Sequence, residues 1–324
     1  MKLIIPMARR QYKNAANFSP PSPLMSIAGR PILLRVLDAV KSLDFSEVIF
    51  IVDSDDSALK KLIAANFKFK VRYILQKNQK GVAHAIYGAK KFMSSESCLI
   101  LFADSILKAN LKSLDKLEGD AIIWTKEVDN PSLFGVVFTH DGLISRLIEK
   151  PETPVSDLAM VGMYYVKSSD KLFDAIAYLI KNKILTKGAY QITDAFQIMI
   201  NRGARILPRK VSSWLDCGTK KRLLEAHKAL IVDQKTASLA KSNVLIRPVF
   251  IEGGVKILNS VIGPNVSIGQ GAKISSSIIS NSIVGEGALV ESGLLDESFI
   301  GSEAKVLGSL KKVNLKDRGV IRDE

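Results

Sequence analysis

The chain has 324 residues, 47% of them hydrophobic, so it is long enough for two domains, yet no apolar run approaches the roughly 18 residues of a membrane span. Its formal charge of +14 comes almost entirely from residues before Lys241. The sequence has no arginine-rich run interleaved with aromatic residues, so this charge favours an anionic small substrate or a solvated lysine-rich surface over nucleic acid. Cys98 and Cys217 lack CxxC spacing, which indicates reduced thiols in a cytoplasmic protein without structural zinc.

The first strand is expected at residues 3–5, and a polar loop over residues 8–22 leads from it toward a helix. In an α/β fold, such a strand and loop usually bind phosphates at the carboxyl end of the sheet. This loop contains no glycine and carries Arg9, Arg10 and Lys13 instead. Side-chain charge would therefore have to replace a cradle of backbone amides.

Strands and helices then alternate, which predicts a Rossmann-like α/β sheet in a first domain over residues 1–235. After residue 120 the pattern changes to short strands, which suggests an inserted, partly antiparallel region. A helix over residues 219–232 closes the domain. The other expected elements are helices at 32–43, 57–66 and 81–92, and strands at 48–52, 71–75, 98–102, 121–125, 135–138, 147–148 and 160–166.

Two aspartates follow apolar segments in positions that suit a divalent cation. Asp104 comes directly after a buried strand, and Asp216 lies in a turn before a helix. Two aspartates from separate loops can share one Mg²⁺ with a triphosphate between them. The alternative for Asp104 is a cap on a helix that starts after Leu107.

Two other segments have the chemistry of substrate contacts. Gln76 ends a strand shortly before Gly81, and a glutamine amide can read a base edge while a glycine admits the base against the backbone. Glu149 and Lys150 suit a phosphorylated sugar, because the carboxylate accepts from hydroxyls and the ammonium pairs with phosphate. The alternatives are an ordinary strand-to-helix loop and a surface pair before a proline turn.

From residue 251 an apolar residue recurs every five or six positions, often followed by glycine, with small and polar residues between. This spacing predicts a left-handed parallel β-helix of hexapeptide repeats, roughly three coils long, within a second domain over residues 244–324. Its flat faces favour self-association into a homo-oligomer. All three histidines precede the repeats, which argues against an acyltransferase site there.

Eight short motifs occur in an order that resembles the sugar-1-phosphate nucleotidylyltransferases, the family of glucose-1-phosphate thymidylyltransferase and mannose-1-phosphate guanylyltransferase. They are Pro23-Leu24 with Gly29-Arg30-Pro31, Gln76 with Gly81-Val82-Ala83-His84-Ala85, Phe102-Ala103-Asp104, Phe134-Gly135-Val136-Val137, Glu149-Lys150-Pro151, Gly162-Met163-Tyr164, Gln191-Ile192-Thr193-Asp194 and Trp214-Leu215-Asp216-Cys217-Gly218-Thr219. The resemblance covers nearly the whole first domain.

The resemblance implies that a nucleoside triphosphate and a sugar 1-phosphate react to give a nucleotide sugar and pyrophosphate, by positioning and charge neutralisation. It implies that Asp104 and Asp216 hold Mg²⁺. The other implied contacts are Gln76 and Gly81 with the base, Gly135, Glu149 and Gly162 with the sugar, and Lys150 with its phosphate.

The sequence departs from the family at the phosphate loop. Lys13 falls at or near the arginine that ends the family's glycine-rich run, and Ser22 replaces the lysine before Pro23-Leu24. Chains of this fold with hexapeptide tails also occur as non-catalytic subunits, including those of a translation-initiation exchange factor. A regulatory or binding subunit is therefore the alternative to an enzyme.

Overall fold

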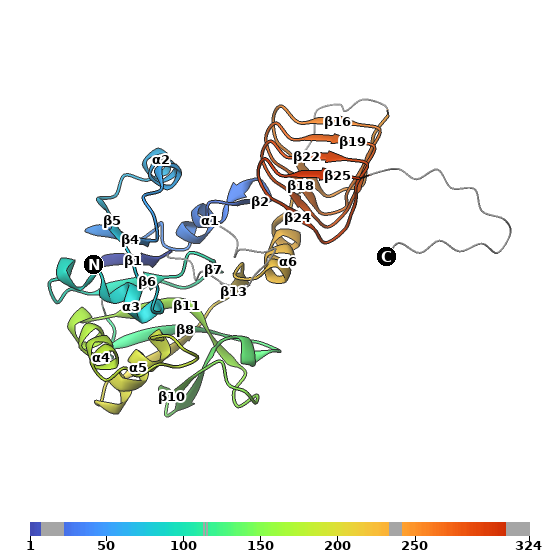
Figure 1. Cartoon of the computed structure of the whole chain (residues 1–324). Helices are drawn as coiled ribbons and strands as arrows, with labels where there is room; N and C mark the ends of the chain where they lie inside the picture. Colours follow the sequence, from blue (N-terminus) through green and yellow to red (C-terminus); the bar gives the residue numbers. More distant parts are fainter. Residues whose placement is uncertain (8–22, 113, 115, 233–241, 309–324) are drawn as a thin grey trace. The chain divides into compact units, whose positions relative to one another are not determined.

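A computed structural model describes residues 1–7, 23–112, 114, 116–232 and 242–308 (Figure 1). Their contacts divide the chain into two compact units. Unit 1 comprises Met1–Met25 and Pro31–Leu223, and unit 2 comprises Ser26–Arg30 and Leu224–Glu324. Both units are therefore discontinuous in sequence. Within the described residues, no helix is long and apolar enough to cross a membrane.

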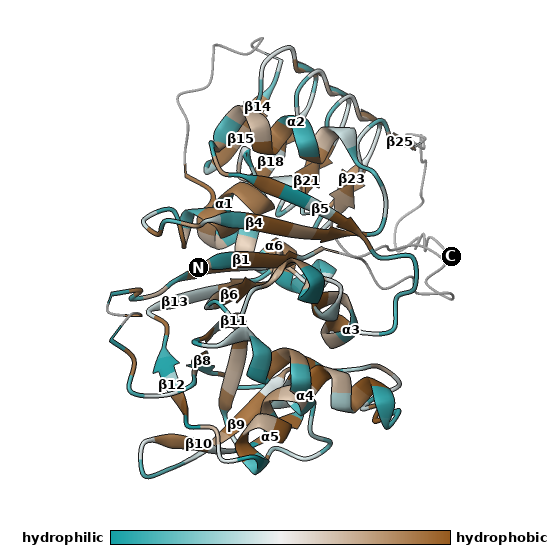
Figure 2. Cartoon of the chain, turned by 90° about the vertical axis from the view of Figure 1, so that its left-hand side faces the viewer, coloured by the Kyte–Doolittle hydropathy of each residue, from teal (hydrophilic) through white to brown (hydrophobic). Residues whose placement is uncertain are grey.

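Unit 1 is built on a mixed sheet, as predicted. Its parallel part has the order β6 (Cys98–Leu101), β1 (Lys2–Pro6), β4 (Glu47–Val52) and β5 (Val71–Leu75). The central strands β1, β4 and β6 are apolar and mostly buried, as parallel strands covered on both faces must be (Figure 2). Their carboxyl ends lie at one edge of the sheet, where the chain continues to Gln76 after β5 and to Asp104 after β6.

The antiparallel part of the sheet begins at β11 (Leu158–Val166), which pairs with β6, β8 and β9. This confirms the predicted mixed region. The remaining strands of the sheet are β8 (Ala121–Glu127), β9 (Gly135–His140), β10 (Leu143–Glu149) and β12 (Ile206–Lys210). A 3₁₀ helix, η2 (Pro131–Leu133), precedes β9.

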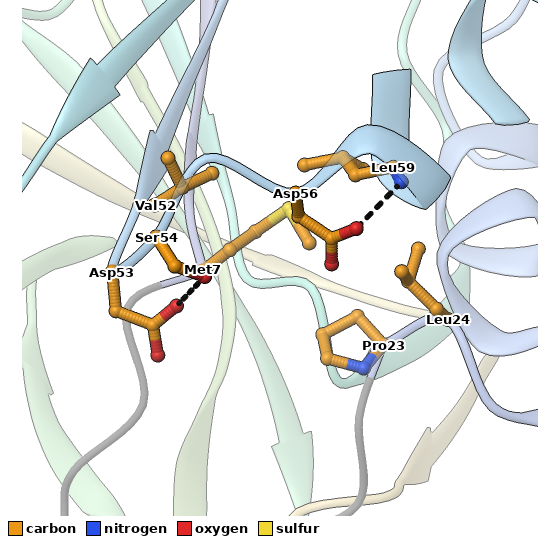
Figure 3. Close-up of a pocket in the computed structure, with 8 residues that line it drawn as sticks. All are labelled: Met7, Pro23, Leu24, Val52, Asp53, Ser54, Asp56 and Leu59. Atoms are coloured by element: carbon orange, nitrogen blue, oxygen red, sulfur yellow. Dashed lines mark hydrogen bonds between the residues drawn. The ribbon is translucent and has the colours of Figure 1, made fainter. Parts of the chain in front are cut away.

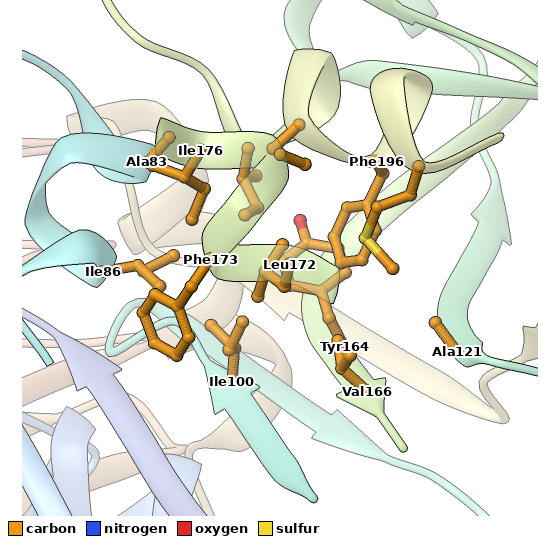
Figure 4. Close-up of a cluster of buried hydrophobic side chains, with 14 of the residues drawn as sticks. Ala83, Ile86, Ile100, Ala121, Tyr164, Val166, Leu172, Phe173, Ile176 and Phe196 are labelled. Carbon is orange, nitrogen blue, oxygen red and sulfur yellow. The ribbon is translucent and has the colours of Figure 1, made fainter. Parts of the chain in front are cut away.

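One face of the sheet packs against the helices α3 (Val82–Tyr87), α4 (Ser169–Lys181) and α5 (Ile192–Asn201) (Figure 4). Successive side chains of a strand point to opposite faces of the sheet, and Ile4 of β1 and Ile100 of β6 point to the face that forms this core. Phe173 and Phe196, each at most 1% exposed, fill the space between α4, α5 and the strands. Truncating such a side chain to alanine typically costs about 3–5 kcal/mol.

Two helices are shorter than the sequence predicts. The helix expected over residues 32–43 is α1 (Ile32–Asp38), and the one expected over 81–92 is α3 followed by the 3₁₀ helix η1 (Lys90–Phe92). The N–H of Gly88 bonds to the carbonyl of Ala85, a tightened bond that ends the α-helical ladder. Apolar spacing continues through these turns, so the pattern alone places the helix ends too late. α2 (Ser57–Asn66) has the predicted bounds.

The segment after Asp104 is a strand, so the alternative in which Asp104 caps a helix is wrong. The chain forms the strand β7 (Ser105–Lys108), which pairs antiparallel with β13 (Ser213–Asp216), so Asp104 does not cap a helix there. The helix α6 (Lys220–Leu230) follows β13 and spans the division between the two units.

Unit 2 contains the predicted left-handed parallel β-helix, with three four-stranded parallel sheets. Ile257 pairs with Ile274, and Ile274 with Val290, so one coil takes 17 residues and the next 16. Four strands per sheet exceed the three coils expected, because the first coil begins at residue 244, before the spacing counted from residue 251, and each coil is slightly shorter than three hexapeptides. The strands are β14 (Val244–Leu245), β15 (Val249–Ile251), β16 (Lys256–Leu258), β17 (Val261–Ile262), β18 (Val266–Ile268), β19 (Lys273–Ser275), β20 (Ile278–Ile279), β21 (Ile283–Val284), β22 (Leu289–Glu291), β23 (Leu294–Leu295), β24 (Phe299–Ile300) and β25 (Lys305–Leu307).

A tight turn between β2 (Ser26–Ile27) and β3 (Arg30–Pro31) joins α6 and the β-helix in unit 2. His227 is 1% exposed, its Nδ1 accepts from the N–H of Ala28 at 3.2 Å, and its Nε2 lies 3.3 Å from the carbonyl oxygen of Asn265. An Nδ1 acceptor leaves the ring proton on Nε2, which therefore donates to that carbonyl. One imidazole thus links three segments that are distant in sequence.

Candidate active site

The pairing of β7 with β13 brings the two predicted metal ligands together. Ser105 lies opposite Asp216 in this ladder, and the N–H of Cys217 donates to the carbonyl of Asp104 at 2.8 Å. A Cβ added to Gly218 would lie 3.0 Å from Asp216 Oδ1 and 3.3 Å from Asp104 Oδ2. Both carboxylates therefore border the same small space, which the missing side chain of Gly218 leaves open.

Burial makes the charged forms of these carboxylates costly. Loss of solvent, together with the charge of Asp216, raises the pKa of Asp104 to about 6. Burial also raises the pKa of Asp216, although its hydrogen bond from Gly218 and the charges of Arg222 and Lys150 oppose the rise. Two carboxylates held together out of water are best neutralised by a cation.

The donor set fits Mg²⁺, which prefers carboxylate oxygens and commonly takes only one or two from the protein, with the rest from water and phosphate. In the described part of the chain, no group of three or more His, Cys, Asp or Glu side chains could hold a metal ion. Asp104 and Asp216 would thus hold the ion together with substrate oxygens.

Arg222 is paired with one carboxylate oxygen of Asp216. Its Nη1 lies 2.5 Å from Asp216 Oδ2, and its Nε donates to Thr219 Oγ1 at 3.1 Å. The guanidinium carbon lies 4.9 Å from the centre of the Phe134 ring, which itself packs edge-on against Trp214. The arginine is therefore held by a carboxylate, a hydroxyl and an aromatic face.

Glu149 and Lys150 lie next to the two aspartates. Glu149 is paired with Gly135 across β9 and β10, and it accepts a hydrogen bond from the buried hydroxyl of Thr193 at 2.5 Å. Burial raises the pKa of Glu149, against the effects of Thr193 and Lys150. The positive charge of Lys150 acts on both Glu149 and Asp216. One ammonium thus offsets negative charge on both Glu149 and the aspartate pair.

Gly135 and Gly162, two of the predicted sugar contacts, lie where neighbouring atoms leave little space for a side chain. Gly162 has φ +82° within an irregularity in the pairing of β11 with β8, and a Cβ there would meet Ser105 Oγ at 2.9 Å and Phe102 Cβ at 3.0 Å. A Cβ on Gly135 would meet Glu149 Oε2 at 3.0 Å. Gly162 therefore lies against residues on either side of Asp104, and Gly135 lies against Glu149.

Gln76 and Gly81 form a second group at the ends of β5 and α3. Gln76 Nε2 lies 3.3 Å from His84 Nδ1, and burial together with the charge of Lys80 lowers the pKa of His84. Gly81 has φ +120°, and a Cβ there would lie 2.4 Å from the carbonyl oxygen of Tyr190. The backbone that approaches Gly81 on its Cβ side is therefore this protein's own.

A pocket opens at the carboxyl end of β4, and none of the predicted site residues that the structure describes lines it (Figure 3). Asp56 accepts from the N–H groups of Ala58 and Leu59 at 2.9 and 3.1 Å, so it caps α2. The other lining residues are Met7, Pro23, Leu24, Val52, Asp53 and Ser54. Part of its polar lining is therefore already engaged in holding a helix.

The sequence does not single out three residues of these groups. Thr193 and His84 appear there only as members of motifs, and the sequence favours an ordinary structural role for His84. Arg222 ends a run of three basic residues at the start of α6, where a helix favours acidic side chains. That misplaced charge is the signal that a carboxylate lies nearby. Lys13 lies outside the described residues.

Comparison with known proteins agrees with this geometry. Residues 18–232 match the family model described as nucleotidyl transferase. Over 249 residues the chain is 29% identical to the low-salt glycan biosynthesis nucleotidyltransferase Agl11 of Haloferax volcanii, covering 74% of this chain and 68% of the relative. It is 30% identical to the UTP–glucose-1-phosphate uridylyltransferase AglF of the same organism, covering 65% of this chain and 88% of AglF.

A glucose-1-phosphate thymidylyltransferase of Streptomyces antibioticus is 28% identical over 79% of this chain and 74% of its own length. Among solved structures, a UDP-glucose pyrophosphorylase complexed with UDP-glucose superimposes with a TM-score of 0.54 and 19% identity, over 70% of this chain and 97% of that one, which shows the fold. With a family model matched over most of unit 1 and the fold shared, the chain belongs to the nucleotidyl transferase family.

Proposed function

We propose that this protein joins a nucleoside triphosphate to a sugar 1-phosphate, giving a nucleotide sugar and pyrophosphate. The observation that supports this most is the buried pair Asp104 and Asp216 beside Glu149 and Lys150. The names of the relatives point the same way, because AglF and the Streptomyces protein act on glucose 1-phosphate.

In this reaction a phosphate oxygen of the sugar 1-phosphate attacks the α-phosphorus of the triphosphate. A new P–O bond forms there as the bond from the α-phosphorus to the oxygen bridging to the β-phosphorus breaks, and pyrophosphate leaves with that electron pair. No covalent enzyme intermediate is needed, so the protein acts by positioning the two phosphates and by stabilising charge.

We assign one role to each group of residues. Lys150 binds the phosphate of the sugar, and Glu149 accepts hydrogen bonds from its hydroxyls, held in place by Thr193. Gly135 and Gly162 leave the space for the sugar ring, while Gln76 and Gly81 contact the base. Asp104 and Asp216 hold Mg²⁺, which when bound draws charge from the phosphate oxygens. From its position in the sequence, we assign Lys13 to neutralising charge on the triphosphate.

The test is a panel assay. The protein is incubated with Mg²⁺, glucose 1-phosphate or another sugar 1-phosphate, and each of UTP, dTTP, GTP, CTP and ATP, with released pyrophosphate as the readout. Turnover is expected with at least one pair and should vanish when EDTA removes the metal. A folded protein that turns over no pair would contradict the proposal and favour a binding or regulatory subunit.

We also propose that the protein forms a homo-oligomer through the β-helix. On the sheet β14–β17–β20–β23, the aligned residues Val244, Ile278 and Leu294 are 55, 51 and 80% exposed. An aligned aliphatic column on a flat face suits contact with a second copy. In light-scattering chromatography, Leu294→Glu should lower the mass, whereas the matched control Val155→Glu on unit 1 should not. An unchanged mass for Leu294→Glu would exclude this face.

We further infer a cytoplasmic location. Cys98 and Cys217 are both buried free thiols, and burial raises the pKa of Cys98 to about 12, so neither is prepared for exchange. A thiol-reactive dye should label neither cysteine until the protein is unfolded. Disulfide-linked material from the native host would contradict the inference.

A further inference from the structure

Arg222 is placed to bind either of two partners. Its guanidinium pairs with Asp216 Oδ2, yet it lies in the same cluster as Lys150, whose charge also acts on Asp216. Its side chain is 21% exposed and that of Asp216 is 16% exposed, so the pair is partly shielded from water but not sealed. A charge pair of this kind can open without leaving either group stranded in a dry core.

Among the described residues, the charges of the cluster favour an anion only once a cation has bound. Asp104, Asp216 and Glu149 carry three negative charges, and Lys150 and Arg222 carry two positive ones. A divalent cation on the aspartates gives the cluster a net positive charge, which suits a phosphate dianion. A cation on Asp216 Oδ1 draws negative charge from that carboxylate, so the guanidinium on Oδ2 is held less strongly and can turn to another anionic acceptor.

The surroundings of Arg222 keep the guanidinium near the site during such an exchange. The face of Phe134 lies 4.9 Å from the guanidinium carbon, and a stacked guanidinium keeps its N–H donors free at its edge. Phe134 is followed directly by Gly135, and its carbonyl accepts the N–H of Lys150 at 2.9 Å. Phe134 thus contacts Arg222 through its ring and Lys150, which is assigned to the sugar phosphate, through its backbone carbonyl.

We propose that Arg222 is a second phosphate-binding residue, which Asp216 holds in reserve and which transfers to the phosphate of the sugar when a divalent cation binds the aspartates. This rests on the proposed function. Arg222 is then both a competitor of the cation in the free protein and a partner of the substrate in the complex. Those two roles predict opposite effects of removing it.

The experiment compares the wild type with Arg222→Gln, Arg222→Lys and a charge-matched control, Arg202→Gln. Arg202 follows α5 directly and lies over the ring of Tyr178 on α4. Mg²⁺ binding is measured by calorimetry without substrates, and KM is measured for each substrate. Arg222→Gln should bind Mg²⁺ about tenfold more tightly and raise the KM for the sugar 1-phosphate at least about tenfold, with the KM for the triphosphate within about twofold.

Arg222→Lys should recover most of the KM change, and Arg202→Gln should match the wild type in every measurement. If Arg222→Gln weakens Mg²⁺ binding, Arg222 merely braces Asp216 and the proposal is overturned. It is also overturned if only the KM for the triphosphate rises, or if nothing changes in an active protein. A wild type that neither binds Mg²⁺ nor turns over would instead reject the proposed function itself.

Discussion

At the scale of single residues, Asp104 carries a charge that its surroundings disfavour. It is buried beside Asp216, and within the described ranges the charges of Arg222 and Lys150 offset those of the pair. Such an arrangement costs stability in the free protein and is useful only if a cation is bound there, so it is typical of a functional position rather than a structural one.

The change Asp104→Asn should therefore separate activity from stability. It keeps the shape of the side chain and removes the charge, so turnover should fall at least about 10²–10³-fold while the free energy of unfolding stays the same or rises. Pyrophosphate release and urea unfolding measure the two effects. A clear loss of stability would instead mark Asp104 as a residue that the fold needs.

A second prediction at this scale concerns Gly81, where both the backbone conformation and the available space exclude a side chain. Its φ is +120°, and a Cβ would collide with the backbone of Tyr190. Gly81→Ala should destabilise the protein by about 2–4 kcal/mol, from strain and displaced backbone together. Gly142→Ala is the control, because Gly142 has φ +76° but nothing within 4 Å of its Cβ, so it should cost only about 1 kcal/mol. Equal losses in urea unfolding would show that the contact with Tyr190 contributes nothing.

At the scale of elements, an ion cluster joins the amino ends of β1, β4 and β5. Glu47 opens β4 and is 3% exposed, with Lys2 Nζ at 3.5 Å and Arg72 Nη2 at 2.8 Å. Burial alone would raise the pKa of Glu47, but the hydrogen bond from Arg72 and the surrounding positive charges outweigh it and lower the pKa below its usual 4.5. The cluster thus fixes three neighbouring strands in register.

The lowered pKa of Glu47 makes the stability of the protein depend on pH. A lowered pKa means that Glu47 contributes stability above about pH 4.5, and that this contribution disappears as the pH falls through the folded-state pKa. Glu47→Gln should therefore cost about 1–2 kcal/mol at pH 7 and progressively less below pH 4.5. The control Glu127→Gln removes the exposed pair with Lys210 and should leave urea unfolding nearly unchanged. A Glu47→Gln cost that stays constant with pH would show that the ion pairs do not carry it.

The sequence predicted those elements whose signal is local. Strand ends place Asp104, and the repeat of apolar residues at short intervals identifies the β-helix, because both depend on neighbours in the chain. The strand β7 was not foreseen, since its partner β13 lies more than a hundred residues away and no local pattern records that pairing. Arg222 was missed for the same reason, because its role depends on a carboxylate beyond its own helix turn and on the ring of Phe134.

At the scale of the whole molecule, one buried histidine links three segments of unit 2. His227 accepts from Ala28 and donates to Asn265, so it connects the segment near the chain start, α6 and the β-helix. His227→Ala removes the hydrogen bonds to these two part-buried backbone groups and should cost about 1–3 kcal/mol.

His227→Asn and His227→Gln serve as matched variants, because an amide both donates and accepts. The variant that reaches both backbone groups should recover part of the loss in thermal unfolding. If His227→Ala unfolds like the wild type, the connection does not contribute to the stability of unit 2. The pyrophosphate assay on the same variants reports whether the effect stays within that unit.

The short turn at residues 26–30 also has a consequence for the order in which the protein can be completed. It emerges from the ribosome early, but its partner His227 follows 199 residues later, and the coil containing Asn265 later still. A β-helix expressed from residue 244 onward would lack both the turn and α6, and Phe250, which packs over Gly29, would lose its cover. Truncation at the boundary that the repeats suggest would therefore expose an apolar ring and favour aggregation.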